Sequence, residues 1–117
     1  MLSTIPVLSS SNINRDIEWY KKHVGFELAF TDGELYVGLH RGPTEIHLQY
    51  HHGTKDDPIH GSVVKFFTHN IEPLVKEFVE RGTILEEKFR KNTPWNTHEF
   101  GFYDLNKNAL FFVQNIP

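Results

Sequence analysis

The sequence contains no cysteine in its 117 residues, which excludes disulfide bridges and thiolate metal sites and makes a cytoplasmic location the expected one. It has no long apolar run, and its first residues lack the charged and apolar regions of a signal peptide, so we expect no membrane partner. The sequence also has no large excess of positive or negative charge. The net charge is −3 and no basic stripe is present, so we expect no nucleic acid partner.

Apolar side chains are present in sufficient number for one core. They make up 38% of the residues, and the ten phenylalanines dominate the aromatic fraction of 14%. A chain of this length buries roughly two-thirds of its accessible surface on folding, which is enough for one sheet layer with helices packed on it. We therefore predict a single domain over residues 1–117.

The first half of the chain shows one helix followed by strands. A cluster of N-cap residues, 9–12, precedes apolar residues at helical spacing, and Gly25 stands where the helix should end. Three strands are then predicted at 26–30, 35–39 and 45–50, with an Asp-Gly turn between the first two. The helical apolar residues are Ile13, Ile17, Tyr20 and Val24.

The second half repeats this order beyond a polar linker at 51–60. A strand at 62–68 precedes a helix that ends at Gly82, and strands are predicted at 84–89, 97–103 and 108–113. Equivalent helix residues lie 58 positions apart, as with Asn12 and Asn70 or Tyr20 and Phe78. The pattern predicts an α+β fold of two βαβββ repeats, at about 1–52 and 60–117.

Two segments resemble the vicinal oxygen chelate superfamily, and more narrowly its glyoxalase/bleomycin-resistance branch. One is residues 12–20 followed by Gly25-Phe26-Glu27-Leu28, and the other is residues 94–110 with the turn Asp104-Leu105-Asn106-Lys107-Asn108. Asn12 replaces the usual Asp, and the turn departs from the commoner Asp-Pro-Asp/Asn-Gly-Asn, both conservatively. The resemblance implies tandem βαβββ modules that curl a sheet around a cleft, and a homodimer whose two clefts draw on both chains.

The resemblance also implies where enzymatic members of the superfamily hold a divalent metal. Carried onto this sequence, those positions are Ile5, His47, Val63 and Phe111, and only His47 can coordinate a metal. One imidazole does not supply the three or four ligands that such sites need. We therefore predict no metal and no cofactor. The alternative is a non-standard metal site built from His47, His51 and His52 in and beside the linker.

Strand alternation predicts which side chains line the cleft. On the strand 45–50, Ile46, Leu48 and Tyr50 should face a helix, and the alternate residues should face the cleft. Trp95 follows a proline in a loop, where it could stack on a flat or cationic ligand or instead close the rim or a subunit contact. The predicted ligand-binding residues are His47, Gln49, Phe67, Trp95, Glu99, Tyr103 and Phe111.

Three functions fit these observations. The first is a metal-free small-molecule binding protein that would sequester a bleomycin-like or other aromatic or cationic compound. The second is a metal-dependent lyase or dioxygenase of the same superfamily. The third is an interaction module whose cleft is filled by its own side chains. No catalytic residue is predicted, because Ser9–Ser11 lack a nucleophile-elbow motif, although acid–base work by Glu45, His47 and Glu99 is chemically possible.

Overall fold

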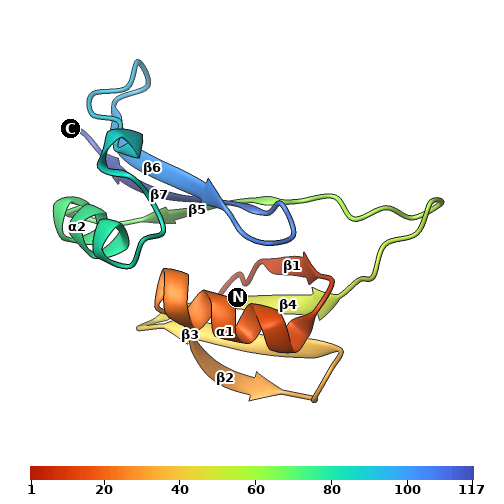
Figure 1. The fold of residues 1–117 in the computed structure, drawn as a ribbon. Coiled ribbons are helices and arrows are strands. Elements are labelled where there is room, and N and C mark those ends of the chain that lie inside the picture. Colours follow the sequence, from red (N-terminus) through yellow and green to blue (C-terminus); the bar gives the residue numbers. More distant parts are fainter.

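A computed structural model describes all 117 residues, and its first module is a four-stranded sheet with one helix (Figure 1). The strand order is β1-β4-β3-β2, with β1 parallel to β4 and the other neighbours antiparallel. The elements are β1 (Val7–Ser10), α1 (Ile13–Val24), β2 (Glu27–Thr31), β3 (Tyr36–Arg41) and β4 (Thr44–Tyr50).

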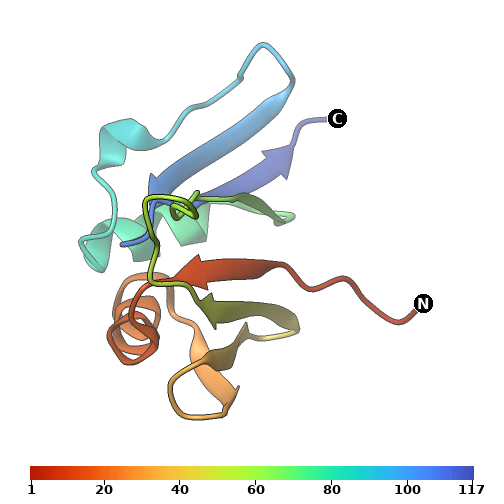
Figure 2. The same ribbon diagram turned by 90° about the vertical axis from the view of Figure 1, so that its right-hand side faces the viewer.

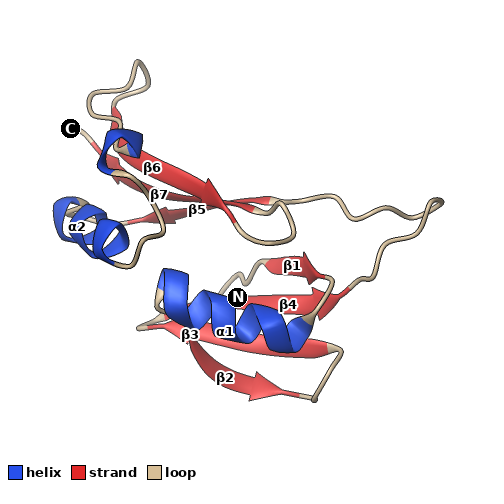
Figure 3. Cartoon of the chain, viewed as in Figure 1, coloured by secondary structure: helices blue, strands red, loops and turns tan.

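The second module repeats this plan with one strand fewer. Its sheet has the order β5-β7-β6, again with the first strand parallel to the last. The elements are β5 (Val63–Phe67), α2 (Glu72–Glu80), the 3-10 helix η1 (Glu86–Lys88), β6 (Thr97–Tyr103) and β7 (Ala109–Asn115). Figure 3 shows the long loop that joins the two modules between β4 and β5. The α+β class predicted from the sequence is confirmed.

The strand predicted at 84–89 is wrong. Ile84 is buried, but the three residues that follow Leu85 are all charged and exposed, and they form η1. Without alternating apolar residues this segment has no face to bury against the sheet. Only Arg90 pairs with β6, through a single antiparallel bridge to Glu99.

The helix ends show why these residues form these elements. Asn12 caps α1, because its side chain accepts a hydrogen bond from the Arg15 backbone N–H at 3.0 Å. Asn70 plays a similar part at α2 and accepts from the Glu72 N–H at 3.3 Å. Gly25 and Gly82 follow the two helices with φ of 75° and 77°, a left-handed conformation that glycine adopts without strain.

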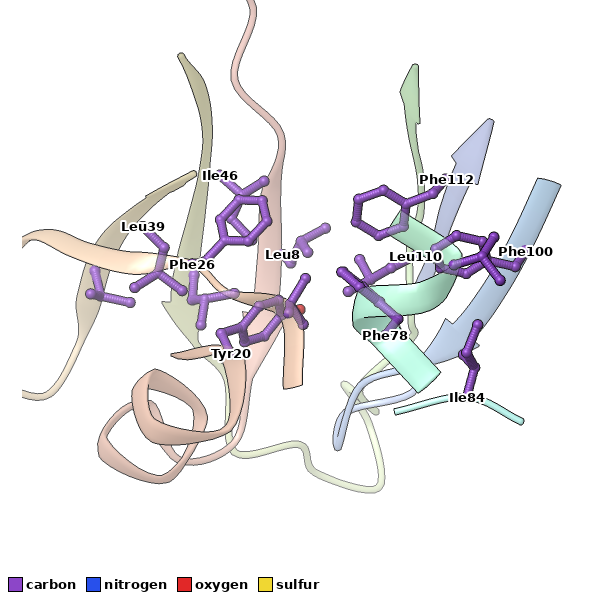
Figure 4. Packing of buried hydrophobic residues seen from close by; sticks show 14 of the residues in the cluster. Leu8, Tyr20, Phe26, Leu39, Ile46, Phe78, Ile84, Phe100, Leu110 and Phe112 are labelled. Atoms are coloured by element: carbon purple, nitrogen blue, oxygen red, sulfur yellow. The ribbon is translucent and has the colours of Figure 1, made fainter. Parts of the chain in front are cut away.

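One hydrophobic cluster joins the modules (Figure 4). Leu8, Tyr20 and Phe26 of the first module point toward the buried side chains of α2, β6 and β7. The rings of Phe26 and Phe66 lie 5.7 Å apart across the boundary. The equivalent helix residues Tyr20 and Phe78 are both fully buried, so each helix contributes its central aromatic ring to the same core.

The turn between β6 and β7 fixes the modules together through buried polar groups. Asp104 accepts a hydrogen bond from the Tyr20 hydroxyl at 2.6 Å, and Asn106 donates to Asp16 at 2.7 Å. Asn108 donates to the backbone carbonyl of Ser9 at 3.1 Å. Buried carboxylates are tolerated only with such partners, so these hydrogen bonds fix the position of the turn on the first module.

The remaining segments lie at the surface. Residues 1–4 extend from the body of the molecule (Figure 2), and most of the loop 51–62 is exposed. None of the helices is both long enough and apolar enough to cross a membrane.

Candidate functional site

Each sheet packs one face on the core and leaves the other, here called its open face, free of that core. On β4, Ile46 and Leu48 are fully buried while Glu45 and His47 lie on the open face, as the alternation predicted. Tyr50, predicted to face a helix, is instead exposed at the strand end. The open face of the first sheet carries Val7, Gly38 and His47, and that of the second carries Lys65, Gly101 and Phe111.

A groove of about 390 Å³ lies beside the open face of the second sheet, where Gly101, Tyr103 and Phe111 of that face meet Ile84 and Phe102, which pack on the core. Gly101 makes room for the Phe111 ring that covers it, since a Cβ there would lie 2.5 Å from Cδ1 of this ring. The walls are mainly apolar, and Lys88 is the one charged residue among them. The side chains that shape the groove are Ile84, Leu85, Lys88, Phe102, Tyr103 and Phe111.

A second cluster lies on the same face of β6, two residues from Gly101. Glu99 is buried and accepts hydrogen bonds from Trp95 Nε1 at 2.7 Å and from the Thr97 hydroxyl at 2.6 Å. Burial acts to raise its pKa, but these hydrogen bonds and the charges of Lys65 and Arg90 together lower the pKa of Glu99 below its ordinary value. The carboxylate therefore stays ionised, and the Arg90 guanidinium stacks 5.1 Å from the Trp95 ring.

The open face of the first sheet is more polar. His47 Nδ1 lies 2.8 Å from the Tyr36 hydroxyl, and His47 Nε2 lies 2.6 Å from Glu45 Oε2. The Phe30 ring meets the imidazole edge-on at 5.2 Å and covers Gly38, where a Cβ would come within 2.2 Å of it. His47 is thus held between a phenol, a carboxylate and an aromatic ring.

The predicted ligand-binding residues fall into two groups. His47 and Gln49 lie on the first sheet. The other five belong to the second sheet or to the loop before β6, where Tyr103 and Phe111 line the groove and Glu99 and Trp95 contact each other. Phe67 is exposed at the end of β5, outside the groove.

Several residues of these clusters were missed by the sequence-based prediction. Leu85 and Lys88 line the groove because the segment 84–89 is not a strand, and the three consecutive charged residues after Leu85 were the signal that could have indicated this. Tyr36 could have been found from strand alternation. It lies two residues before Gly38 on β3, so the two residues share the open face.

The residues do not fit a family-type metal site. The strand register places Val7 beside His47 and Lys65 beside Phe111, which corrects the positions predicted at Ile5 and Val63 by two residues. An imidazole, an isopropyl group, an ammonium group and a phenyl ring cannot hold a divalent cation.

The alternative metal site is also not formed. No three His, Asp or Glu side chains come together in a group that could hold a metal ion. His51 Nε2 contacts Asp57 at 3.1 Å, and the His52 ring packs on Tyr50 instead of approaching His47.

Comparison with known proteins agrees on fold and leaves activity open. No protein-family model and no curated protein sequence matches this chain. Among solved structures, a bleomycin-binding protein complexed with bleomycin superposes with a TM-score of 0.73 at 16% identity, over 98% of this chain and 99% of that one. The bleomycin resistance determinant of transposon Tn5 gives 0.74 at 19% identity, over 98% of each chain.

An enzyme has the same architecture. Lactoylglutathione lyase from Agrobacterium tumefaciens superposes with a TM-score of 0.72 at 12% identity, over 97% of this chain and 94% of that one. A binding protein, a resistance determinant and an enzyme thus share this arrangement of strands and helices, so the comparison identifies the fold alone. The resemblance read from residues 12–28 and 94–110 is confirmed at that level, and the chain has the bleomycin-resistance/glyoxalase fold along nearly its whole length.

Proposed function

We propose that this protein binds a small, mainly apolar or aromatic molecule in the groove beside the open face of its second sheet. The observation that carries the proposal is the groove itself, which has a volume of about 390 Å³ and mainly apolar walls with a few polar groups among them. Small-molecule sites in proteins have this size and this mixture of lining residues. Phe111 and Tyr103 supply the aromatic contact surface, and binding and sequestration are the proposed activity.

The proposed ligand class is an aromatic, cationic compound of the bleomycin type. Trp95 is half exposed and can offer a ring face, and the ionised Glu99 beside it can offer a negative charge. Lys88 lies among the groove residues and would attract an anion, so an aromatic anion is the competing ligand class to test. The overall charge of −3 is too small to choose between them.

We also propose that the protein works as a homodimer, in which open faces of two chains approach each other. Val7, Val63 and Phe67 are exposed on or beside these faces, although large apolar side chains usually gain from being covered. A two-fold partner would cover them with the same surface from the second chain. Light scattering after size-exclusion chromatography should give twice the mass of 13.7 kDa, and a monomer at all concentrations would contradict it.

The groove can be tested with a matched pair of leucines. Leu85 and Leu105 are both exposed, but only Leu85 lines the groove, so truncating either one should leave the fold intact. Bleomycin, an aromatic cation and an aromatic carboxylate would be titrated into each variant by calorimetry. We expect Leu85→Ala to weaken binding of the accepted compound about tenfold, since it loses apolar contact area, and Leu105→Ala to leave it unchanged. Equal effects of the two variants would contradict binding in the groove.

A metal assay separates binding from lyase or dioxygenase chemistry. Untagged protein would be analysed by mass spectrometry for metal content, with His47→Ala as the control. We expect less than stoichiometric metal in both proteins, because Glu45 contacts His47 but no third ligating side chain joins them. One metal per chain that is lost in His47→Ala would overturn the proposal in favour of a metalloenzyme.

A further inference from the structure

Three side chains on the open face of the first sheet form a continuous chain of hydrogen bonds. Tyr36 comes from β3, and His47 and Glu45 come from β4. The Tyr36 hydroxyl lies 2.8 Å from His47 Nδ1, and His47 Nε2 lies 2.6 Å from Glu45 Oε2. This cluster shares no residue with the groove of the second sheet, so its role is separate from the proposed ligand site.

The chemistry of the three groups sets the direction of the hydrogen bonds. An ionised carboxylate only accepts, so the proton between Glu45 and His47 resides on Nε2. In the neutral imidazole Nδ1 then has a free lone pair, and it accepts the hydrogen bond from the Tyr36 O–H. Carboxylate, imidazole and hydroxyl stand in the order found where a general base activates a hydroxyl nucleophile.

The surroundings hold the imidazole in this orientation. The Phe30 ring contacts His47 edge-on at 5.2 Å and stacks on Tyr36 at 6.3 Å. Gly38, the cross-strand neighbour of His47, has no side chain that would push the Phe30 ring away. The His47 side chain is consequently 16% exposed, which strengthens its hydrogen bonds relative to those of an imidazole in water.

We propose that Tyr36 is a nucleophile that accepts acyl groups from small activated esters, with His47 as its general base and Glu45 as the positioning residue. The Tyr36 oxygen attacks the ester carbonyl carbon while its proton passes to His47 Nδ1. The bond from that carbon to the leaving alkoxide or phenoxide then breaks, which leaves an acyl-tyrosine and an imidazolium stabilised by Glu45. The leaving group or water takes the proton from the imidazolium.

The other tyrosines make this proposal sharply testable, because exposure and activation rank the four differently. Tyr103 is 70% exposed and Tyr50 is 39% exposed, and neither hydroxyl has a hydrogen-bond partner. Tyr20 is fully buried, and burial together with the charge of Asp104 raises its pKa well above the ordinary value. Reactivity governed by exposure alone would favour Tyr103, whereas the hydrogen-bonded chain favours the less accessible Tyr36.

The test treats the whole protein with p-nitrophenyl acetate and measures acetylation of each tyrosine peptide by mass spectrometry over time. We expect Tyr36 to be acetylated first, and His47→Gln to slow it about a hundredfold, the usual contribution of a general base. Glu45→Gln should give an intermediate rate, and Tyr36→Phe should remove the fast adduct. Thermal melts identify any variant that fails to fold.

Two results would overturn the proposal. One is Tyr103 acetylated as fast as Tyr36 in the unaltered protein. The other is a Tyr36 rate that His47→Gln leaves unchanged in a folded variant. Tyr50→Phe is the matched control, because Tyr50 is exposed and lies outside the groove, and it should leave the Tyr36 rate as it was. These outcomes do not depend on ligand binding in the groove, so the two proposals can fail separately.

Discussion

The open faces of the two sheets have equivalent backbones and different chemistry. In each, a glycine on the next-to-last strand pairs with a residue on the last strand: Gly38 with His47, and Gly101 with Phe111. In each, an aromatic ring covers the glycine, Phe30 in one case and Phe111 in the other. The first face thereby holds an imidazole between polar partners, and the second holds an apolar groove.

The difference shows how a repeated unit takes up separate roles. Helix ends, buried helix rings and strand pairing are kept in both modules because folding requires them of each. Side chains on the open faces have no part in the core, so a polar cluster and an apolar groove are equally compatible with folding. The two proposed functions therefore lie where the modules differ, and the shared core lies where they agree.

The largest expected effect comes from the helix rings that occupy equivalent positions. Phe78→Ala should lower the free energy of unfolding by about 4 kcal/mol, because it leaves a cavity among Phe100, Phe102 and Phe112. Tyr20→Phe keeps the ring and removes only the hydroxyl bound to Asp104, so the expected loss is about 1–3 kcal/mol. Urea unfolding measures both, and equal losses would contradict this ranking, because the Tyr20 hydroxyl would then contribute as much as the whole Phe78 ring.

The covered glycines test whether the two faces respond alike to the same change. Gly101→Ala places a methyl group against the Phe111 ring and should cost about 1–3 kcal/mol and weaken ligand binding in the groove. Gly38→Ala should cost less, because Phe30 is half exposed and can swing toward solvent. Thermal melts and ligand titrations of both variants provide the comparison, and a larger cost at Gly38 would contradict it.

Loss of the N-terminal cap should also cost more stability at one helix than at the other. Asn12→Ala removes a cap with a 3.0 Å hydrogen bond and should lower the free energy of unfolding by about 1 kcal/mol. Asn70→Ala removes a longer bond of 3.3 Å from a residue outside the formal cap and should cost less than that. Chemical denaturation resolves such a difference, and the opposite order would show that Asn70 is the stronger cap.

The smallest expected effect depends on pH and concerns Glu99 on the second sheet. Its folded pKa lies below the ordinary glutamate value, so its ionised form stabilises the fold above that value and loses this contribution as the pH falls through the folded pKa. Near neutral pH, Glu99→Gln should melt at a lower temperature than the unaltered protein. The two melting temperatures should converge as the pH falls below about 4.5. A constant difference would assign the effect to packing instead of charge.

Local features of the fold could be predicted from the sequence, because nearby residues determine them. The spacing of Ile13, Tyr20 and Val24 marks the buried side of α1, and Asn12 and Gly25 mark its two ends. Alternation on β4 separates Ile46 and Leu48 from His47. The lack of metal-ligating side chains at the three other family positions is likewise a matter of residue types, and a shift of one residue in those strands would not supply them.

Other assignments remain predictions. The ligand-binding role of His47, Gln49, Phe67, Trp95, Glu99, Tyr103 and Phe111 has support from the groove only for Tyr103 and Phe111. The single-domain assignment and the cytoplasmic location rest on length and on the missing cysteines. The binding experiments above bear on the first of these most directly.

What the sequence by itself determined is the order of elements, their ends, their buried faces and the repeat. Only the tertiary structure decided the register of Val7 with His47, the irregular segment 84–89 and the hydrogen bonds of Asp104 and Asn106 with α1. The groove and the hydrogen bonds of Tyr36, His47 and Glu45 belong to the same group. Periodicity reports the face on which a residue lies within its own element. It does not report the contact between β1 and β4 or the contacts of Asp104 and Asn106 with α1, because those partners lie far apart in the chain.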